Sequence, residues 1–153
     1  GRKTPDPKNI LISCFENIIG FVKKEFSLTG QDPYLAGKSM GGRIASYLGA
    51  EGFPTSGLLF LGYPLHRPGK TDQIRDDHLY GLKIPMLFIS GKKDKFAEPA
   101  LLDPIVRKLN QAKLYQIPEG DHSFRVPKKF GKSEIQVWSD VGQVMVNWIF
   151  QRK

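Results

Sequence analysis

The sequence predicts an α/β fold, a parallel sheet of about four strands with helices on both faces. Three observations predict it. Segments with helical periodicity alternate with short apolar runs, an order typical of βαβ units. The apolar runs are continuous rather than alternating, as expected of strands covered on both faces. The chain has 153 residues, 40% hydrophobic and 25% charged, which suits a single soluble domain spanning 1–153.

The chain opens with an expected helix. Asp6 is suited to cap this helix, Pro7 to begin it and Gly30 to end it. Its apolar side chains recur on one face, at Leu11, Cys14, Phe15, Ile18, Val22 and Phe26. This pattern is typical of an amphipathic helix.

Four strands and three further helices are expected after it. The strands cover residues 34–37, 57–63, 85–91 and 113–117. The helices cover about 40–48, 101–109 and 137–149. Residues 64–83 are polar and rich in turn formers, which indicates a long loop that passes over the edge of the sheet. We call this loop the 64–83 excursion. With right-handed crossovers the strands are parallel, and their carboxyl ends share the edge at which such sheets bind ligands.

The composition limits the binding partners and the cellular compartment that can be expected for this protein. The formal net charge is +8, but Lys and Arg are scattered without a dense basic run, so we expect no nucleic-acid partner. No apolar run approaches the roughly 20 residues that span a bilayer. Residues 1–7 lack the apolar stretch of a secretory signal, and we expect no membrane partner. A single cysteine, Cys14, cannot form an internal disulfide, which suits a cytoplasmic protein.

The first strand ends in a candidate nucleophile. Residues 37–41, Gly-Lys-Ser-Met-Gly, match the G-x-S-x-G nucleophile elbow, a tight strand-to-helix turn that exposes the serine hydroxyl. Glycines on either side of Ser39 remove side chains that would collide with neighbouring backbone. The N–H of Met40, at the helix start, is an expected oxyanion donor. A plain glycine-rich turn is the alternative, whereas a P-loop is excluded because Asp32 stands where that motif needs glycine.

The third and fourth strands end in a candidate acid and a candidate base. Asp94 is placed to accept the imidazole N–H of a catalytic histidine, and His122 is placed to reach Ser39 as general base. Serine, acid and histidine in this order, each after its own strand, are typical of α/β-hydrolases. An ordinary turn aspartate and a surface histidine are the alternative interpretation. Asp121 is the neighbour of His122, but adjacent side chains on an extended loop point apart, so Asp94 is preferred as the acid that orients His122. Glu98 is the reserve candidate for this role.

No metal or cofactor is expected. His66 and His78 lie in the 64–83 excursion near several acids, Asp72, Asp76 and Asp77. No His-x-x-x-His motif or cysteine pair accompanies these residues. We therefore expect a solvated polar loop there rather than a metal site.

Four motifs make the sequence similar to a known family. They are Gly-Lys-Ser-Met-Gly-Gly-Arg at 37–43, Gly-Tyr-Pro-Leu-His at 62–66, Ile-Pro-Met-Leu-Phe-Ile-Ser-Gly at 84–91 and Asp-His-Ser-Phe at 121–124. Over essentially the whole chain, the sequence resembles the dienelactone-hydrolase-like α/β-hydrolases. The similarity is to a branch of bacterial predicted hydrolases related to testis-expressed protein thirty and the non-specific-lethal-complex scaffold subunit. The resemblance implies Ser39 as nucleophile, Asp94 as acid and His122 as base.

The resemblance also implies further strands upstream. Family members carry several N-terminal strands, one followed by a His-Gly-type loop that gives the second oxyanion N–H, so this chain matches the C-terminal part of their fold. Without those strands, the sheet edge beside Tyr34–Gly37 presents unpaired backbone groups, and the apolar faces of the flanking helices lose their partners. Large exposed apolar patches are rare on stable monomers. We expect that the natural protein is longer or that a second chain covers this edge by self-association.

Two functions agree with these observations. The first is a serine hydrolase of a small carboxylic ester or related acyl substrate, which acts through an acyl-enzyme without a cofactor. The second is a catalytically inactive α/β-hydrolase-like scaffold or interaction protein, because half of the oxyanion hole has no counterpart in the sequence. The candidates for lining a substrate pocket are Tyr63, Leu65, Phe96 and Phe124, although such loop residues equally often pack in the core.

Overall fold

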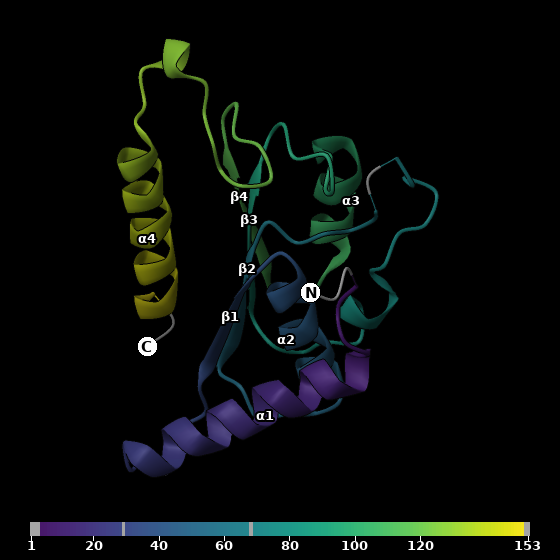
Figure 1. The fold of residues 1–153 in the computed structure, drawn as a ribbon, viewed down its shortest axis with the longest axis vertical. Coiled ribbons are helices and arrows are strands. Elements are labelled where there is room, and N and C mark those ends of the chain that lie inside the picture. Colours follow the sequence, from purple (N-terminus) through teal and green to yellow (C-terminus); the bar gives the residue numbers. More distant parts are fainter. Residues whose placement is uncertain (1–3, 29, 68, 152–153) are drawn as a thin grey trace.

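The structure is a computed structural model that describes residues 4–28, 30–67 and 69–151. Its centre is a four-stranded parallel sheet with the strand order β1-β2-β3-β4 (Figure 1). The strands are β1 (Tyr34–Lys38), β2 (Gly57–Leu61), β3 (Met86–Gly91) and β4 (Ala112–Ile117). The α/β class and the number and direction of the strands predicted from the sequence are confirmed.

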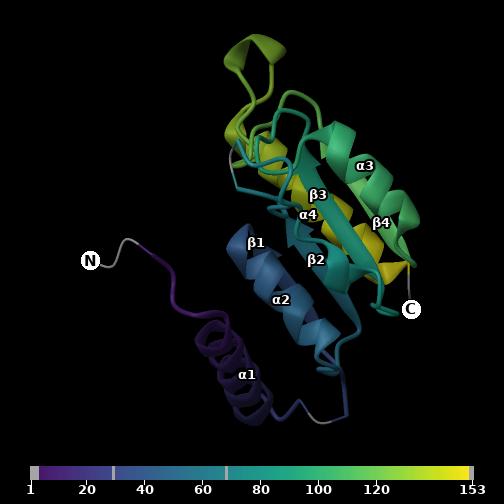
Figure 2. The ribbon, with the colours of Figure 1, turned by 90° about the vertical axis from the view of Figure 1, so that its right-hand side faces the viewer.

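Helices cover both faces of the sheet, as Figure 2 shows. α2 and α3 lie on one face, α1 packs against α2, and α4 lies on the opposite face. The bounds are α1 (Lys8–Glu25), α2 (Met40–Ala50), α3 (Pro99–Lys108), α4 (Glu134–Phe150), and the short 3₁₀ helices η1 (Asp77–Leu79) and η2 (Lys128–Phe130). Within the described part of the chain, no helix is both long and apolar enough to cross a bilayer.

The strands contribute alternate side chains to two separate cores. On the face covered by α2 and α3, the rings of Phe60 and Phe88 pack with centroids 4.7 Å apart. On the other face, Leu59 and Leu87 pack in the core that includes Trp148 of α4. Because successive side chains of a strand point to opposite faces, burial on both faces explains the continuous apolar runs.

The register aligns the carboxyl ends of the strands. Lys38 at the end of β1 pairs with Leu61 of β2, which in turn pairs with Ile89 of β3. At the end of β3, Gly91 pairs with Ile117, the last residue of β4. The loops that follow β1, β3 and β4 therefore leave the sheet at the same edge.

The first helix differs from its prediction at both ends. Its N-cap position is occupied by Pro7 instead of Asp6, and the helix ends at Glu25, before Gly30. The early end coincides with Ser27, whose φ of 51° is incompatible with a continuing right-handed helix. Local backbone geometry, which the apolar periodicity does not report, therefore determines the end of α1.

The second half of α1 and the free edge of β1 border an apolar groove. Ile18 is 56% exposed and Val22 37% exposed, whereas Ile12, nearer the start of α1, is buried. Ile18 and Val22, together with Tyr34 of β1 and Ile149 of α4, line a groove of about 760 Å³. This open stretch agrees with the expectation that the apolar faces of the flanking helices lose their partners, since α1 contributes one buried residue, Ile12, to the core and the others that pack there, such as Ile19, are only partly buried. The outer edge of β1 has no neighbour among the described strands, as expected.

Candidate active site

Ser39 occupies the turn between β1 and α2. Its φ of 52° and ψ of −119° lie outside the helical and extended regions, as predicted for a nucleophile elbow. The Ser39 N–H donates to the Leu61 carbonyl at 2.9 Å, and the Arg43 N–H donates to the Ser39 carbonyl at 3.3 Å. A strained backbone of this kind costs on the order of 1–3 kcal/mol, so the surrounding strand and helix must maintain it.

The glycines around Ser39 have unequal roles. A Cβ on Gly37 would overlap the backbone of Gly41 and Gly42, and a Cβ on Gly42 would lie 2.7 Å from the Gly37 carbonyl oxygen. At Gly41 the nearest atom to an added Cβ is on the ring of Phe15, at 4.0 Å. Close contact between strand and helix therefore requires glycine at 37 and 42. This corrects the expectation that both glycines of the G-x-S-x-G motif prevent a collision.

The structure brings Ser39, His122 and Asp94 together. The Ser39 Oγ lies 2.8 Å from His122 Nε2, and His122 Nδ1 lies 2.9 Å and 3.0 Å from the two carboxylate oxygens of Asp94. The Asp94 side chain is fully buried, whereas 20% of the His122 side chain is exposed. The carboxylate is thus shielded from water, while the imidazole borders the solvent from which a substrate would arrive.

The contacts of Asp94 determine which ring nitrogen carries the proton. Asp94 Oδ1 also accepts the backbone N–H of Phe96 at 2.8 Å. An ionised carboxylate only accepts hydrogen bonds, so His122 Nδ1 carries a proton and donates it to Asp94. In the neutral ring Nε2 is then an acceptor, and the Ser39 hydroxyl donates to it. The serine proton therefore points at a base.

Close backbone contacts position the loop that carries His122. A Cβ on Gly91, at the end of β3, would overlap the carbonyl groups of Gly120 and Asp121. Gly62, with a φ of 68°, lies against the histidine, and a Cβ there would lie 3.2 Å from the His122 carbonyl oxygen and 3.4 Å from its Nδ1. Only glycine combines that φ with so little space. The ends of β2 and β3 thus both support the imidazole.

Lys38 connects the end of β1 to the same loop. Its Nζ donates to the His122 carbonyl at 2.9 Å and lies 4.7 Å from the centroid of the Phe124 ring. Burial lowers the pKa of Lys38 from its ordinary value, and the charges of Asp94 and Asp121 act in the opposite direction. Sequence reasoning missed this contact, because the residue before the serine is a variable position of the G-x-S-x-G pattern.

The two alternative acids have other positions. The Asp121 carboxylate accepts the N–H groups of Ser123 at 2.7 Å and Arg125 at 2.9 Å, so it shapes the turn around His122. Glu98 is exposed at the N-cap position of α3. In the described part of the chain, the acid that hydrogen-bonds the imidazole is Asp94.

Three of the four candidate pocket residues are buried in the core. Tyr63, Leu65 and Phe124 are each at most 1% exposed, so the structure packs their side chains instead of opening them to a pocket. Phe96 is half-buried, and the centroid of its ring lies 4.3 Å from that of the His122 imidazole. Phe96 is therefore the member of the set that lies beside the candidate base.

Much of the 64–83 excursion is exposed, but His66 is buried and His78 half-buried, which corrects the expectation that these histidines are solvated. His66 is 1% exposed. His78 Nε2 lies 2.8 Å from Ser46 Oγ and 3.3 Å from the Tyr63 hydroxyl, and burial lowers the pKa of His78 to about 4. The excursion folds back onto the domain because it also carries apolar residues such as Leu79, which is fully buried. Among the described residues, no three His, Cys, Asp or Glu side chains are grouped to hold a metal ion.

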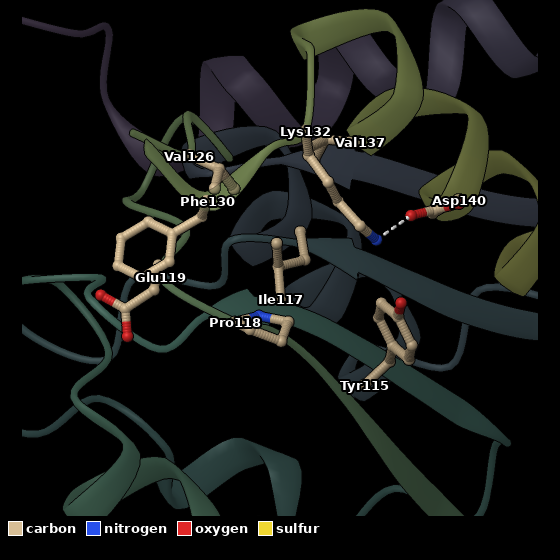
Figure 3. A pocket seen from close by; sticks show the side chains of 9 residues that line it. All are labelled: Tyr115, Ile117, Pro118, Glu119, Val126, Phe130, Lys132, Val137 and Asp140. Atoms are coloured by element: carbon tan, nitrogen blue, oxygen red, sulfur yellow. Dashed lines mark hydrogen bonds and ion pairs between the residues drawn. The ribbon is translucent and has the colours of Figure 1, made fainter. Parts of the chain in front are cut away.

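A separate cavity lies beside the end of β4. Figure 3 shows its lining, which includes the apolar side chains of Ile117, Phe130 and Val137, around a volume of about 200 Å³. The Lys132 Nζ donates to the Asp140 carboxylate at 2.6 Å on one side of this cavity. None of the three converging residues lines it, so it is not the place where the candidate nucleophile would react.

The fold is similar to those of solved hydrolase structures. The structure of a monoacylglycerol lipase from Paleococcus ferrophilus matches with a TM-score of 0.71 and 12% identity, over 100% of this chain and 79% of the lipase. A thermophilic esterase from Thermogutta terrifontis matches with a TM-score of 0.62 and 17% identity, over 86% of this chain and 69% of the esterase. An alpha-beta serine hydrolase homologue from Coxiella burnetii matches with a TM-score of 0.60 and 15% identity, over 80% of this chain. The match spans only 55% of the Coxiella protein's length.

The comparison with protein families extends this similarity from the fold to the sequence. Residues 1–150 match the alpha/beta hydrolase domain family, which is nearly the whole chain. The parallel sheet and the strained turn at Ser39 agree with this match. The chain belongs to the alpha/beta hydrolase domain family.

Proposed function

We propose that the chain is a serine hydrolase of a carboxylic ester or related acyl substrate. In this proposal Ser39 is the nucleophile, His122 the general base and Asp94 the acid that orients the base. The observation that supports it is the 2.8 Å separation of Ser39 Oγ and His122 Nε2, with the opposite ring nitrogen on a buried carboxylate. An esterase and a monoacylglycerol lipase among the structural relatives favour an ester as substrate.

The reaction follows from the direction of these hydrogen bonds. The Ser39 hydroxyl attacks the acyl carbon while His122 Nε2 takes its proton. Asp94 stabilises the resulting imidazolium, which then gives the proton to the leaving alcohol. Water hydrolyses the acyl-enzyme, with His122 again acting as base. These steps need no cofactor.

The Met40 N–H is the proposed first donor of the oxyanion hole. Met40 is the first residue of α2, so its N–H has no acceptor within the helix and lies at the positive end of the helix dipole. We propose that the second donor lies on a segment that covers the free edge of β1, either from a longer form of the protein or from a second copy. Loss of one oxyanion donor costs about 2.7–4 kcal/mol of transition-state stabilisation.

Within the family, we propose the dienelactone-hydrolase-like branch, on the motifs at 37–43, 62–66, 84–91 and 121–124. The second candidate function is an inactive scaffold, which the similarity of this branch to scaffold proteins favours. Both functions use the same fold, and they differ in whether Ser39 is reactive. The deciding measurement is therefore the reactivity of this side chain.

A fluorophosphonate probe tests the proposal, because it labels an activated serine without knowledge of the substrate. We expect the chain to be labelled and mass spectrometry to find the adduct on Ser39. Ser39→Ala is expected to abolish labelling, while Ser27→Ala, which changes an exposed serine after α1, keeps it. A folded chain that stays unlabelled would exclude the hydrolase and favour the scaffold.

Lys38→Met is expected to slow labelling of Ser39 about fivefold. The variant removes the hydrogen bond to the His122 carbonyl and lets the imidazole move relative to the serine. A hydrogen bond from a charged donor contributes about 1.5–3 kcal/mol, and we expect about 1 kcal/mol here because the Lys38 side chain is only partly buried. Lys38→Arg keeps a donor and should retain most of the rate, and Lys113→Met on β4 is the control for charge. Equal labelling rates in Lys38→Met and the unmodified chain would contradict this role.

A further inference from the structure

A cationic cavity lies along α2, within one helical turn of Ser39. It has a volume of about 240 Å³, and its lining includes Lys8, Arg43, Arg75 and Met40. Met40 directly follows Ser39, and Arg43 lies on the same face of α2 one turn later. Lys8 comes from α1, and Arg75 from the segment after β2. Three separate parts of the chain thus each contribute a positive charge to one small space.

Among the residues that the structure describes, the two arginines have no acidic partner. Neither Arg43 nor Arg75 forms an ion pair within the described ranges, whereas Lys8 pairs with Glu51 at 3.2 Å. Burial and then the charges of Arg43 and Arg67 lower the pKa of Arg75 from its ordinary value. Like charges that share a partly desolvated site repel one another until an anion joins them.

Arg43 also carries an unsatisfied donor. Its Nε is buried and has no hydrogen-bond partner in the described part of the chain. Side chains on a helix lean toward its N-terminus, which for Arg43 is the direction of Met40 and Ser39. The planar guanidinium group matches the geometry of carboxylate and phosphate oxygens. The cavity therefore offers an anion the positive charge and the planar group of Arg43, and a small movement of this side chain would also bring its unused Nε–H to the anion.

We propose that Arg43 and Arg75 of this cavity bind an anionic group, a carboxylate or a phosphate, carried by the acyl substrate. The assignment to a substrate rests on the proposed function, although the anion site itself does not. A rise of about 1.5 Å per residue places Arg43 about 6 Å along α2 from Ser39. A short ester can span that distance between its acyl carbon and a charged end. The substrate class is therefore a short, negatively charged ester rather than a neutral long-chain one.

Thermal unfolding with succinate or inorganic phosphate tests the site without catalysis. At ten times the dissociation constant, binding stabilises the folded chain by about 1.4 kcal/mol and raises Tm by roughly 3–5 °C over chloride at equal ionic strength. Arg43→Met/Arg75→Met should lose this shift, and the corresponding double lysine variant should keep part of it. Arg107→Met/Lys108→Met on α3 removes the same charge elsewhere and should keep all of it. No shift in the unmodified chain would overturn the proposal, and so would an equal shift in the double methionine variant.

Kinetics with two p-nitrophenyl esters then connect the site to the substrate. We expect kcat/KM for the hydrogen succinate ester to exceed that for the neutral butyrate ester about tenfold, and this ratio should approach one in Arg75→Met. A Tm shift with succinate but not phosphate assigns a carboxylate, and the reverse assigns a phosphate. If neither ester is hydrolysed while the arginine-dependent shift remains, the proposed function fails and the anion site stands. If both are hydrolysed equally and no anion raises Tm, the anion site fails and the hydrolase stands.

Discussion

Asp94→Asn is expected to lower kcat for ester hydrolysis roughly 10⁴-fold. Asp94 Oδ1 accepts the Phe96 N–H at 2.8 Å, so the single oxygen of an asparagine amide would be held there. Its NH₂ group would then replace Oδ2, which lies 2.9 Å from His122 Nδ1. The amide N–H and the Nδ1–H would then repel each other, although Oδ1 remains 3.0 Å from Nδ1, and we expect the imidazole to shift its proton to Nε2. That nitrogen could no longer accept the proton of Ser39.

Steady-state hydrolysis of p-nitrophenyl butyrate and the rate of fluorophosphonate labelling both measure this loss. Glu98→Gln is the matched control, because Glu98 is the reserve acid and is exposed at the start of α3. It should leave both rates unchanged. Circular dichroism of each variant establishes that the chain is folded. A folded Asp94→Asn variant with near-normal rates, or a large loss in Glu98→Gln, would show that Asp94 does not orient the base.

The positions of the candidate residues were predictable because a parallel sheet converts chain order into spatial order. Each carboxyl end of β1, β3 and β4 is a place where the chain changes direction at one shared edge. Residue types with complementary chemistry after those three strands therefore predict that Ser39, Asp94 and His122 meet. The short apolar runs were sufficient for this, since the prediction needs only where a strand ends, not how its side chains pack.

Whether an individual loop side chain is buried or exposed was not predictable in the same way. Tyr63 and His66 follow β2 directly and were expected near a pocket or in solvent, yet both are buried. Their burial depends on the 64–83 excursion folding back over them, with Leu79 as an apolar anchor. The packing of this segment joins residues that are separated in the sequence, and no periodic pattern of residue types predicts it. The bond from Lys38 to the His122 carbonyl is hidden for the same reason.

Gly37→Ala is expected to destabilise the chain by about 3 kcal/mol or more, near or above the upper end of the usual cost of overpacking. The added Cβ would overlap the backbone of Gly41 and Gly42, and backbone cannot move aside as a flexible side chain can. For a chain of this size, that loss corresponds to a fall in Tm of roughly 6–12 °C. Separation of β1 from the start of α2 would also displace Ser39, and a shift of about 1 Å can reduce the rate roughly 10²-fold.

Gly41→Ala provides the sharpest control for Gly37→Ala, because both glycines belong to the same G-x-S-x-G motif. An added Cβ at Gly41 has the Phe15 ring at 4.0 Å as its nearest neighbour, and the position lies in α2, where alanine favours the helix. Gly20→Ala, in α1 with no atom within 4 Å of the new Cβ, controls for the helix effect alone. We expect Tm to hold or rise in both controls and labelling of Ser39 to continue. Equal losses of Tm in Gly37→Ala and Gly41→Ala would contradict this account. They would mean that the turn at Ser39 needs both glycines, for a reason other than the close approach of the backbone at Gly37.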